Sequence, residues 1–123
     1  MEKNGLPKIV LKNLNANVVV YTSLQKEYDV LMQICEAGGR TFAGRYSPTE
    51  KNIWRNDEYK ARTCIIDCEG EGYLYPSTID YEAKRNRVLN LDGYIRMHEI
   101  SPETINKIKN WFEENKPDRE SKG

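Results

Sequence analysis

Two kinds of apolar pattern divide the chain. Short runs rich in β-branched and aromatic residues predict strands, and two longer segments with an apolar residue at every third or fourth position predict amphipathic helices. The predicted strands cover residues 8–11, 17–22, 40–46, 61–68, 73–76, 88–91 and 94–100. Turn-forming residues between neighbouring strands favour an antiparallel-rich sheet of about five to six strands. With both helices packed on that sheet, the predicted fold class is α+β.

Three connections are typical of β-hairpins. Residues 13–17 are rich in Asn, residues 69–72 alternate Glu with Gly, and Asp92-Gly93 is the strongest two-residue hairpin signal in the chain. The last connection would join strands 88–91 and 94–100. Alternation along the second of these would place His98 with Tyr94 and Arg96 on the more solvated face.

The first helix has clear start and stop signals. Thr22 is the expected N-cap, Gln25 would complete a capping box, and Gly38 and Gly39 end the helix. Its apolar stripe consists of Leu24, Tyr28, Leu31, Met32 and Cys35. A stripe of this kind is scaffold that packs on a sheet, and it predicts no site.

The second helix is the best-signalled element. Ser101 is the expected N-cap and Pro102 the first helical residue. Its apolar stripe consists of Ile105, Ile108, Trp111 and Phe112. Residues 116–123 are charged and contain proline, so we expect a disordered tail after a single domain that spans residues 1–115.

The composition limits the classes of partner. The 123 residues include 19 basic and 19 acidic side chains, so the formal net charge is zero. Bulk binding of nucleic acid usually needs a basic excess, and we therefore expect none. The hydrophobic content of 38% is low for a domain that folds alone, and we expect a homodimer or a higher homo-oligomer. No apolar run suits a signal peptide or a membrane span, which predicts a cytoplasmic protein with no membrane contact.

Signals for catalysis and for metal binding are weak. The three cysteines are expected to be reduced, since Cys64 and Cys68 stand roughly 13 Å apart along one predicted strand, too far for a disulfide. They lack zinc-site spacing, and the acidic residues at 67, 69 and 71 lack the spacing of an EF-hand loop. His98 is the only histidine and has no acid or nucleophile beside it in sequence, so it is more typical of a surface or hydrogen-bonded residue than of a catalytic base. We expect no catalytic residues, no metal and no cofactor.

The segment 38–64 carries the strongest functional signal. It holds six basic residues against three acidic ones, and aromatic residues lie between them. Guanidinium groups bind phosphate oxygens and flat rings stack on bases, which predicts a site for a nucleotide-type anion. The candidate ligand-binding residues are Arg40, Phe42, Arg45, Tyr46, Trp54, Arg55, Tyr59 and Arg62.

Two alternatives stay open at this point. The aromatic residues of the segment could close a small core while the basic ones are solvated around it. The same composition also suits a hot-spot patch for a macromolecular partner, so the chain could be a protein-interaction factor. The basic turn at residues 84–87 is usually a solvated feature, but it could join the rim of a pocket.

The order of three segments resembles a known family. These are YTSLQKEYDVLMQICEAGGRTF at residues 21–42, a tryptophan-containing loop, and RTCIIDCEGEGYLY at residues 62–75. Over roughly residues 18–100 the layout is similar to that of phage anti-Thoeris (Thoeris anti-defence) signal-sponge proteins. The resemblance implies an oligomeric protein, encoded by a phage or prophage, that sequesters an intact cyclic ADP-ribose-like signal in a pocket built partly between protomers. Such capture would block bacterial TIR-based immunity.

Overall fold

Five strands form one mixed sheet in the order β2-β4-β3-β1-β5. The structure is a computed structural model that describes residues 5–12 and 17–115. The strands are β1 (Asn17–Tyr21), β2 (Thr41–Phe42), β3 (Thr63–Cys68), β4 (Tyr73–Thr78) and β5 (Val88–Leu89). The α-helices are α1 (Gln25–Ala37), α2 (Ile79–Glu82), α3 (Leu91–Met97) and α4 (Pro102–Glu114). Three single 3₁₀ turns, η1 (Pro48–Glu50), η2 (Ile53–Arg55) and η3 (Lys60–Arg62), follow β2.

The pairing of the strands confirms the α+β class. β3 lies between β1 and β4 and is antiparallel to both, whereas β5 and β2 run parallel to their neighbours β1 and β4. β1 and β3 are interior strands, as their β-branched sequences favour. The hairpin predicted from the Glu and Gly residues at 69–72 is confirmed as the connection of β3 to β4.

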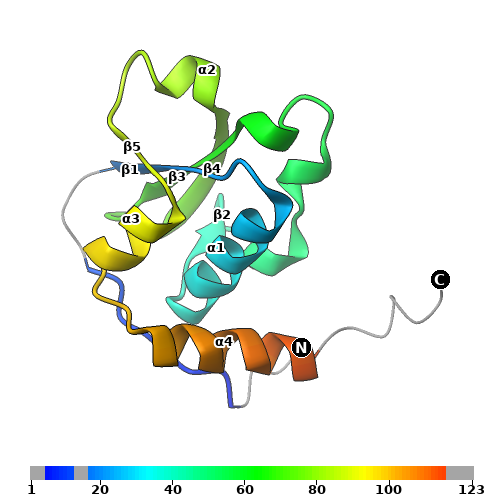
Figure 1. The fold of residues 1–123 in the computed structure, drawn as a ribbon, viewed down its shortest axis with the longest axis vertical. Coiled ribbons are helices and arrows are strands. Elements are labelled where there is room, and N and C mark those ends of the chain that lie inside the picture. The colour runs from blue at the N-terminus through cyan, green and yellow to red at the C-terminus, as the bar shows by residue number, and fades with distance from the viewer. Residues whose placement is uncertain (1–4, 13–16, 116–123) are drawn as a thin grey trace.

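One face of the sheet carries the main core. The register places Val20 opposite Ile65 and Asp67 between Val18 and Leu74, so these side chains share a face. The apolar members of this set pack with the buried stripe of α1. Figure 1 shows α1 and α3 on that side of the sheet, with α4 crossing beyond α1 and α2 on the opposite side. An acid, Asp67, therefore points into the core side of the sheet.

The first helix begins slightly later than the sequence predicts. Leu24 is the N-cap, and the Glu27 carboxylate accepts hydrogen bonds from the Ser23 and Leu24 backbone N–H groups, at 3.1 and 3.3 Å. Thr22 instead donates its hydroxyl to the Thr63 carbonyl and is fully buried. The predicted end of the helix is confirmed, since Gly38 is the C-cap and Gly39 has φ of +82°.

The predicted strand at 8–11 is not a strand. This segment runs along the end of α1, where the Ile9 N–H donates to the Ala37 carbonyl. Leu11 is 7% exposed and packs so closely on Gly38 that a Cβ there would meet its Cδ1 at 2.4 Å. The turn predicted over residues 13–17 lies mostly outside the described residues.

The hairpin predicted around Asp92-Gly93 is wrong. β5 has only two residues, and the following segment forms α3 because the Asn90 side chain accepts a hydrogen bond from the Gly93 N–H at 2.8 Å and caps the helix. Apolar residues at 91, 94, 95 and 97 fit a helical period as well as they fit alternation. Consequently His98 is not on a solvated strand face. It follows the last residue of α3 and is 4% exposed.

The predictions for β2 and α4 are confirmed in outline. The strand expected at 40–46 shortens to β2, after which Ala43 and Gly44, both with positive φ, turn the chain so that Tyr46 bridges back to Phe42. After β4 the chain forms α2, a helix of four residues. Ser101 caps α4 through the Thr104 N–H, and Pro102 is its first residue. The predicted tail at 116–123 lies outside the described residues. Among the residues that are described, no helix is long and apolar enough to span a membrane.

Candidate functional site

The eight candidate ligand-binding residues of the segment 38–64 do not form one surface. Phe42 is 4% exposed and belongs to the main core. The Arg40 side chain is 10% exposed and pairs with Asp67. Arg40 and Phe42 thus face the interior of the protein. The other six candidates are exposed or partly exposed.

Partly buried hydrogen bonds hold the middle of this segment against α1 and the residues before it. The Tyr28 hydroxyl donates to the Lys51 carbonyl and accepts from the Ile53 N–H, both at 3.0 Å. The Glu36 carboxylate accepts from the Thr49 N–H and hydroxyl at 3.1 and 2.6 Å. Trp54 donates its indole N–H to the Thr22 carbonyl at 3.0 Å and packs against the core. This part of the segment covers the helix.

The outer residues of the segment are solvated or locally paired. Arg45 and Arg55 are exposed, and Tyr59 is half-buried. Tyr46 is 40% exposed and lies under the Lys51 ammonium, 3.9 Å from the ring centre. Arg62 donates to Asp80 at 3.3 Å and to the Glu58 carbonyl. None of the eight lines the cavity described below.

A buried polar cluster lies on the core side of β3. Arg40 donates from Nε to Asp67 Oδ1 at 2.7 Å and from Nη2 to Oδ2 at 3.4 Å. The Tyr94 hydroxyl donates to Asp67 Oδ2 at 2.7 Å and lies 3.7 Å from Cys35 Sγ. Asp67 therefore accepts from α3 and from the segment before β2 at once, which joins three parts of the fold.

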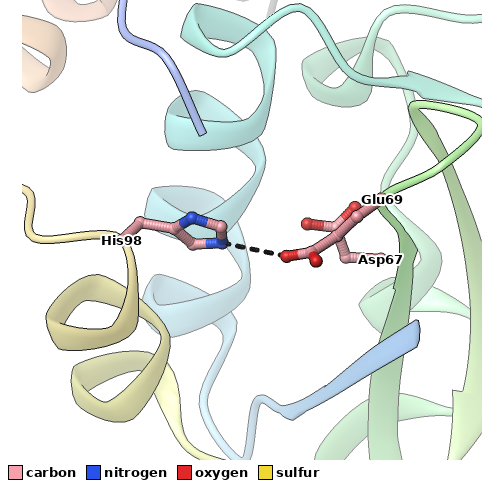
Figure 2. A group of neighbouring side chains, drawn as sticks. All are labelled: Asp67, Glu69 and His98. Atoms are coloured by element: carbon pink, nitrogen blue, oxygen red, sulfur yellow. Dashed lines mark ion pairs between the residues drawn. The ribbon is translucent and has the colours of Figure 1, made fainter. Parts of the chain in front are cut away.

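His98 and Glu69 continue the cluster toward the N-terminal segment. His98 Nδ1 accepts a hydrogen bond from the Lys12 N–H at 2.8 Å, and its Nε2 lies 3.5 Å from Glu69 Oε2. Figure 2 shows the ring directed from the end of α3 toward Glu69, with Asp67 beside it. Both side chains are fully buried. Because Nδ1 accepts, the neutral ring carries its proton on Nε2, facing the carboxylate.

Burial favours the neutral forms of Cys35, Tyr94 and His98 in this cluster. It raises the pKa of the Cys35 thiol to about 12 and raises the pKa of Tyr94 well above its ordinary value. It also lowers the pKa of His98, with Arg40 and Lys12 acting in the same direction and Asp67 opposing them. A fully buried, protonated thiol is a poor nucleophile, so the cluster does not provide nucleophilic chemistry.

Asp67, Glu69 and His98 do not fit a metal site, although each offers a ligand atom within 4.8 Å of the others. A histidine that binds a metal through Nε2 carries its proton on Nδ1, but here Nδ1 faces the Lys12 N–H donor. The Arg40 guanidinium already places a positive charge on Asp67. These three side chains are therefore better arranged to hold a proton on His98 Nε2 than to bind a metal ion.

A pocket lies between α3 and the edge of the sheet. The cavity has a volume of about 500 Å³, which is within the usual range for small-molecule sites. Its apolar lining comes from Val18, Val19, Leu89 and Met97, and its polar lining from Asn17, Arg87 and Arg96, with Gly93 completing the wall. The start of β1, the end of β5 with the residue before that strand, and α3 thus supply one site.

The two arginines of the pocket are available for a ligand. Both are exposed, and neither guanidinium makes a hydrogen bond or an ion pair with the residues that the structure describes. Arg62, by contrast, is held by Asp80. Two unneutralised guanidinium groups beside an apolar cavity attract an anion and can hold its oxygens by charge-assisted hydrogen bonds.

The pocket and the buried cluster are neighbours in the fold. Val18, in the pocket wall, is paired with Asp67 across β1 and β3. Met97, also in the wall, is followed directly by His98. The sequence indicates only part of this arrangement. Arg87 belongs to the basic turn that could join a pocket rim, whereas Arg96 and Met97 are assigned to a strand.

Comparison of the chain with protein-family models, with curated proteins and with solved structures finds no match. The function is therefore inferred from the pocket and the cluster themselves.

Proposed function

We propose that this protein captures a small nucleotide-type anion in the pocket between α3 and the sheet edge and holds it without chemical change. The observation that carries the proposal is the pair of unneutralised arginines, Arg87 and Arg96, beside an apolar cavity of about 500 Å³. The arginines suit phosphate oxygens, and the Val, Leu and Met side chains suit the flat or apolar remainder of the ligand. The site therefore differs from the one that the sequence predicts, while the ligand class is the same.

The lining of the pocket supports capture over catalysis. Its eight described residues are Asn, Val, Arg, Leu, Gly and Met, and none of these is a common general acid, general base or nucleophile. The buried cluster beneath holds a histidine and carboxylates, but His98 and Glu69 are fully buried. In the setting that the family resemblance implies, capture of a cyclic ADP-ribose-like signal would withdraw it from TIR-based (Thoeris) immunity in a bacterial host.

Calorimetric titration with AMP, ADP-ribose, cyclic ADP-ribose and inorganic pyrophosphate tests this function. We expect saturable binding of at least one organic phosphate, accompanied by a rise in melting temperature that grows with its concentration. Mass spectrometry of the molecule released by heating should return it intact. If none of these anions binds, the proposal is wrong and a macromolecular partner becomes the better interpretation.

Matched arginine variants locate the site. Arg87→Gln and Arg96→Gln each remove a charged donor, whose loss costs about 1.5–3 kcal/mol, so we expect affinity to fall by roughly 10- to 100-fold. Arg55→Gln changes an exposed arginine outside the pocket and is the control, with unchanged affinity expected. If Arg55→Gln weakens binding and the pocket variants do not, the ligand binds on the segment 38–64 instead.

A further inference from the structure

His98 ties the end of α3 to two other parts of the fold. Its N–H donates to the Tyr94 carbonyl at 3.1 Å as the helix ends, and its ring packs edge-on against the Tyr94 ring with centres 4.6 Å apart. Its Nδ1 accepts from the Lys12 N–H of the N-terminal segment, and its Nε2 faces Glu69. Figure 2 shows this ring bridging the space between α3 and the end of β3. The helix that carries Arg96 and Met97 into the pocket is therefore anchored at its last turn by His98.

The anchor depends on the protonation state of the ring. A neutral ring with its proton on Nε2 presents a lone pair to the Lys12 N–H. The imidazolium carries a proton on both nitrogens, so Nδ1–H would face N–H and the hydrogen bond from Lys12 would be lost. A buried donor left without an acceptor is costly, and rotation of the ring or movement of the Lys12 backbone would relieve it.

The charged and titratable groups around the ring come from every element packed on it. Asp67, on β3, favours the imidazolium by its charge, and the Glu69 carboxylate, in the turn after β3, lies 3.5 Å from Nε2. Arg40, which precedes β2, and Lys12, in the N-terminal segment, oppose the imidazolium. Tyr94, on α3, and Cys35, on α1, are neutral at physiological pH. Opposing charges thus act on the ring together, and the acceptor role of Nδ1 decides which form fits the fold.

We infer that His98 is a positioning residue for the pocket: as the Nε2–H tautomer it holds α3 in the ligand-binding arrangement, and its protonation loosens α3 and releases the anion. This inference rests on the proposed function for its ligand, but its structural part concerns the free protein. The inference adds release of the anion at acidic pH to the proposed capture.

Nuclear magnetic resonance of the free protein tests the structural part. The chain contains one histidine, so its ring signals need no assignment by mutation. The ¹⁵N shifts should show Nδ1 as the unprotonated nitrogen at pH 7.5, and the Met97 methyl signal should move with the same midpoint as the His98 ring on acidification. An Nδ1–H tautomer, a Met97 methyl that does not follow the ring, or one-to-one perturbation of the ring by Zn²⁺ would each overturn the inference.

Titration with ADP-ribose across the same pH range tests the release. Its pyrophosphate stays ionised there, so the ligand's own charge does not change. We expect affinity to fall at least tenfold as the ring becomes protonated.

In His98→Gln the side-chain carbonyl can accept a hydrogen bond from the Lys12 N–H but does not titrate, so binding should persist without this pH dependence. His98→Leu removes the acceptor and should bind weakly at every pH. Equal pH profiles for the natural protein and His98→Gln would contradict release by His98. Failure of ADP-ribose to bind at any pH would count against the proposed ligand class alone. The magnetic resonance result would still decide the structural part of the inference.

Discussion

At the scale of single residues, Asp67 is the centre of the buried polar cluster. Its side chain is 1% exposed, yet both carboxylate oxygens accept hydrogen bonds, from Arg40 and from Tyr94. A buried charge is tolerated in a protein interior only when it is paired and hydrogen-bonded, and Asp67 meets both conditions. Arg40, in turn, depends on Asp67 for its only opposite charge in the described ion pairs.

Replacement of Asp67 should therefore be severe. Asp67→Asn keeps the shape of the side chain but leaves the Arg40 guanidinium buried without its counter-ion. We expect a loss of about 3–5 kcal/mol in the free energy of unfolding, measured by chemical denaturation. Asp80→Asn is the control, because the Arg62–Asp80 pair is more than half exposed and its loss should cost less than about 1 kcal/mol. Similar losses in the two variants would show that the Arg40–Asp67 pair contributes no more than a surface pair.

The cluster could be foreseen only in part from the sequence. Alternation along Thr63, Ile65 and Asp67 predicts that these three share a face, and an acid on the apolar face of an interior strand needs a partner. Nothing in the local sequence identifies that partner, since Arg40 lies 27 positions away. The alternating pattern places His98 on a strand face, whereas its burial follows from α3, which that pattern does not reveal.

At the scale of elements, caps decide which predictions succeed. α4 has Ser101 and Pro102 at its start, and it forms where the sequence predicts. α3 has Asn90 as its cap, but the Asp92-Gly93 pair inside its first turn is also a strong hairpin signal. In a short segment that fits both the helical period and strand alternation, the pattern alone does not decide between helix and strand, and tertiary contacts determine which forms. Because of this ambiguity, the sequence does not predict the pocket, which is lined in part by α3.

The segment between β2 and β3 also shows how a basic, aromatic pattern can be structural. If the Tyr28 hydroxyl holds this segment on α1, Tyr28→Phe should leave the Lys51 carbonyl and the Ile53 N–H without their partner. We expect a loss of about 1–3 kcal/mol in the free energy of unfolding and unchanged anion affinity. Tyr46→Phe removes a hydroxyl from an exposed ring and should change stability by no more than about 0.5 kcal/mol. A strong loss of anion binding in Tyr28→Phe would show that the segment belongs to the site.

At the scale of the whole molecule, the lowered pKa of His98 makes global stability depend on pH. In the unfolded chain the ring has a pKa near 6.5, and burial lowers it in the folded protein. Between the two values the unfolded state binds more protons, so this contribution to stability is complete above pH 6.5 and is lost as the pH falls toward the folded pKa. Chemical denaturation at pH 7.5 and at pH 5.5 should show lower stability at the acidic value. His98→Gln should reduce that difference, and an equally large difference in the variant would assign it to other groups.

The edges of the sheet have a consequence for contacts between molecules. Both outer strands, β2 and β5, are two residues long, and Pro76 occupies the part of β4 that extends beyond its pairing with β2. A neighbouring molecule therefore finds few consecutive backbone groups with which to continue the sheet. Within the described residues, the sheet edges therefore favour self-assembly through side-chain surfaces over fibril-like growth by strand addition.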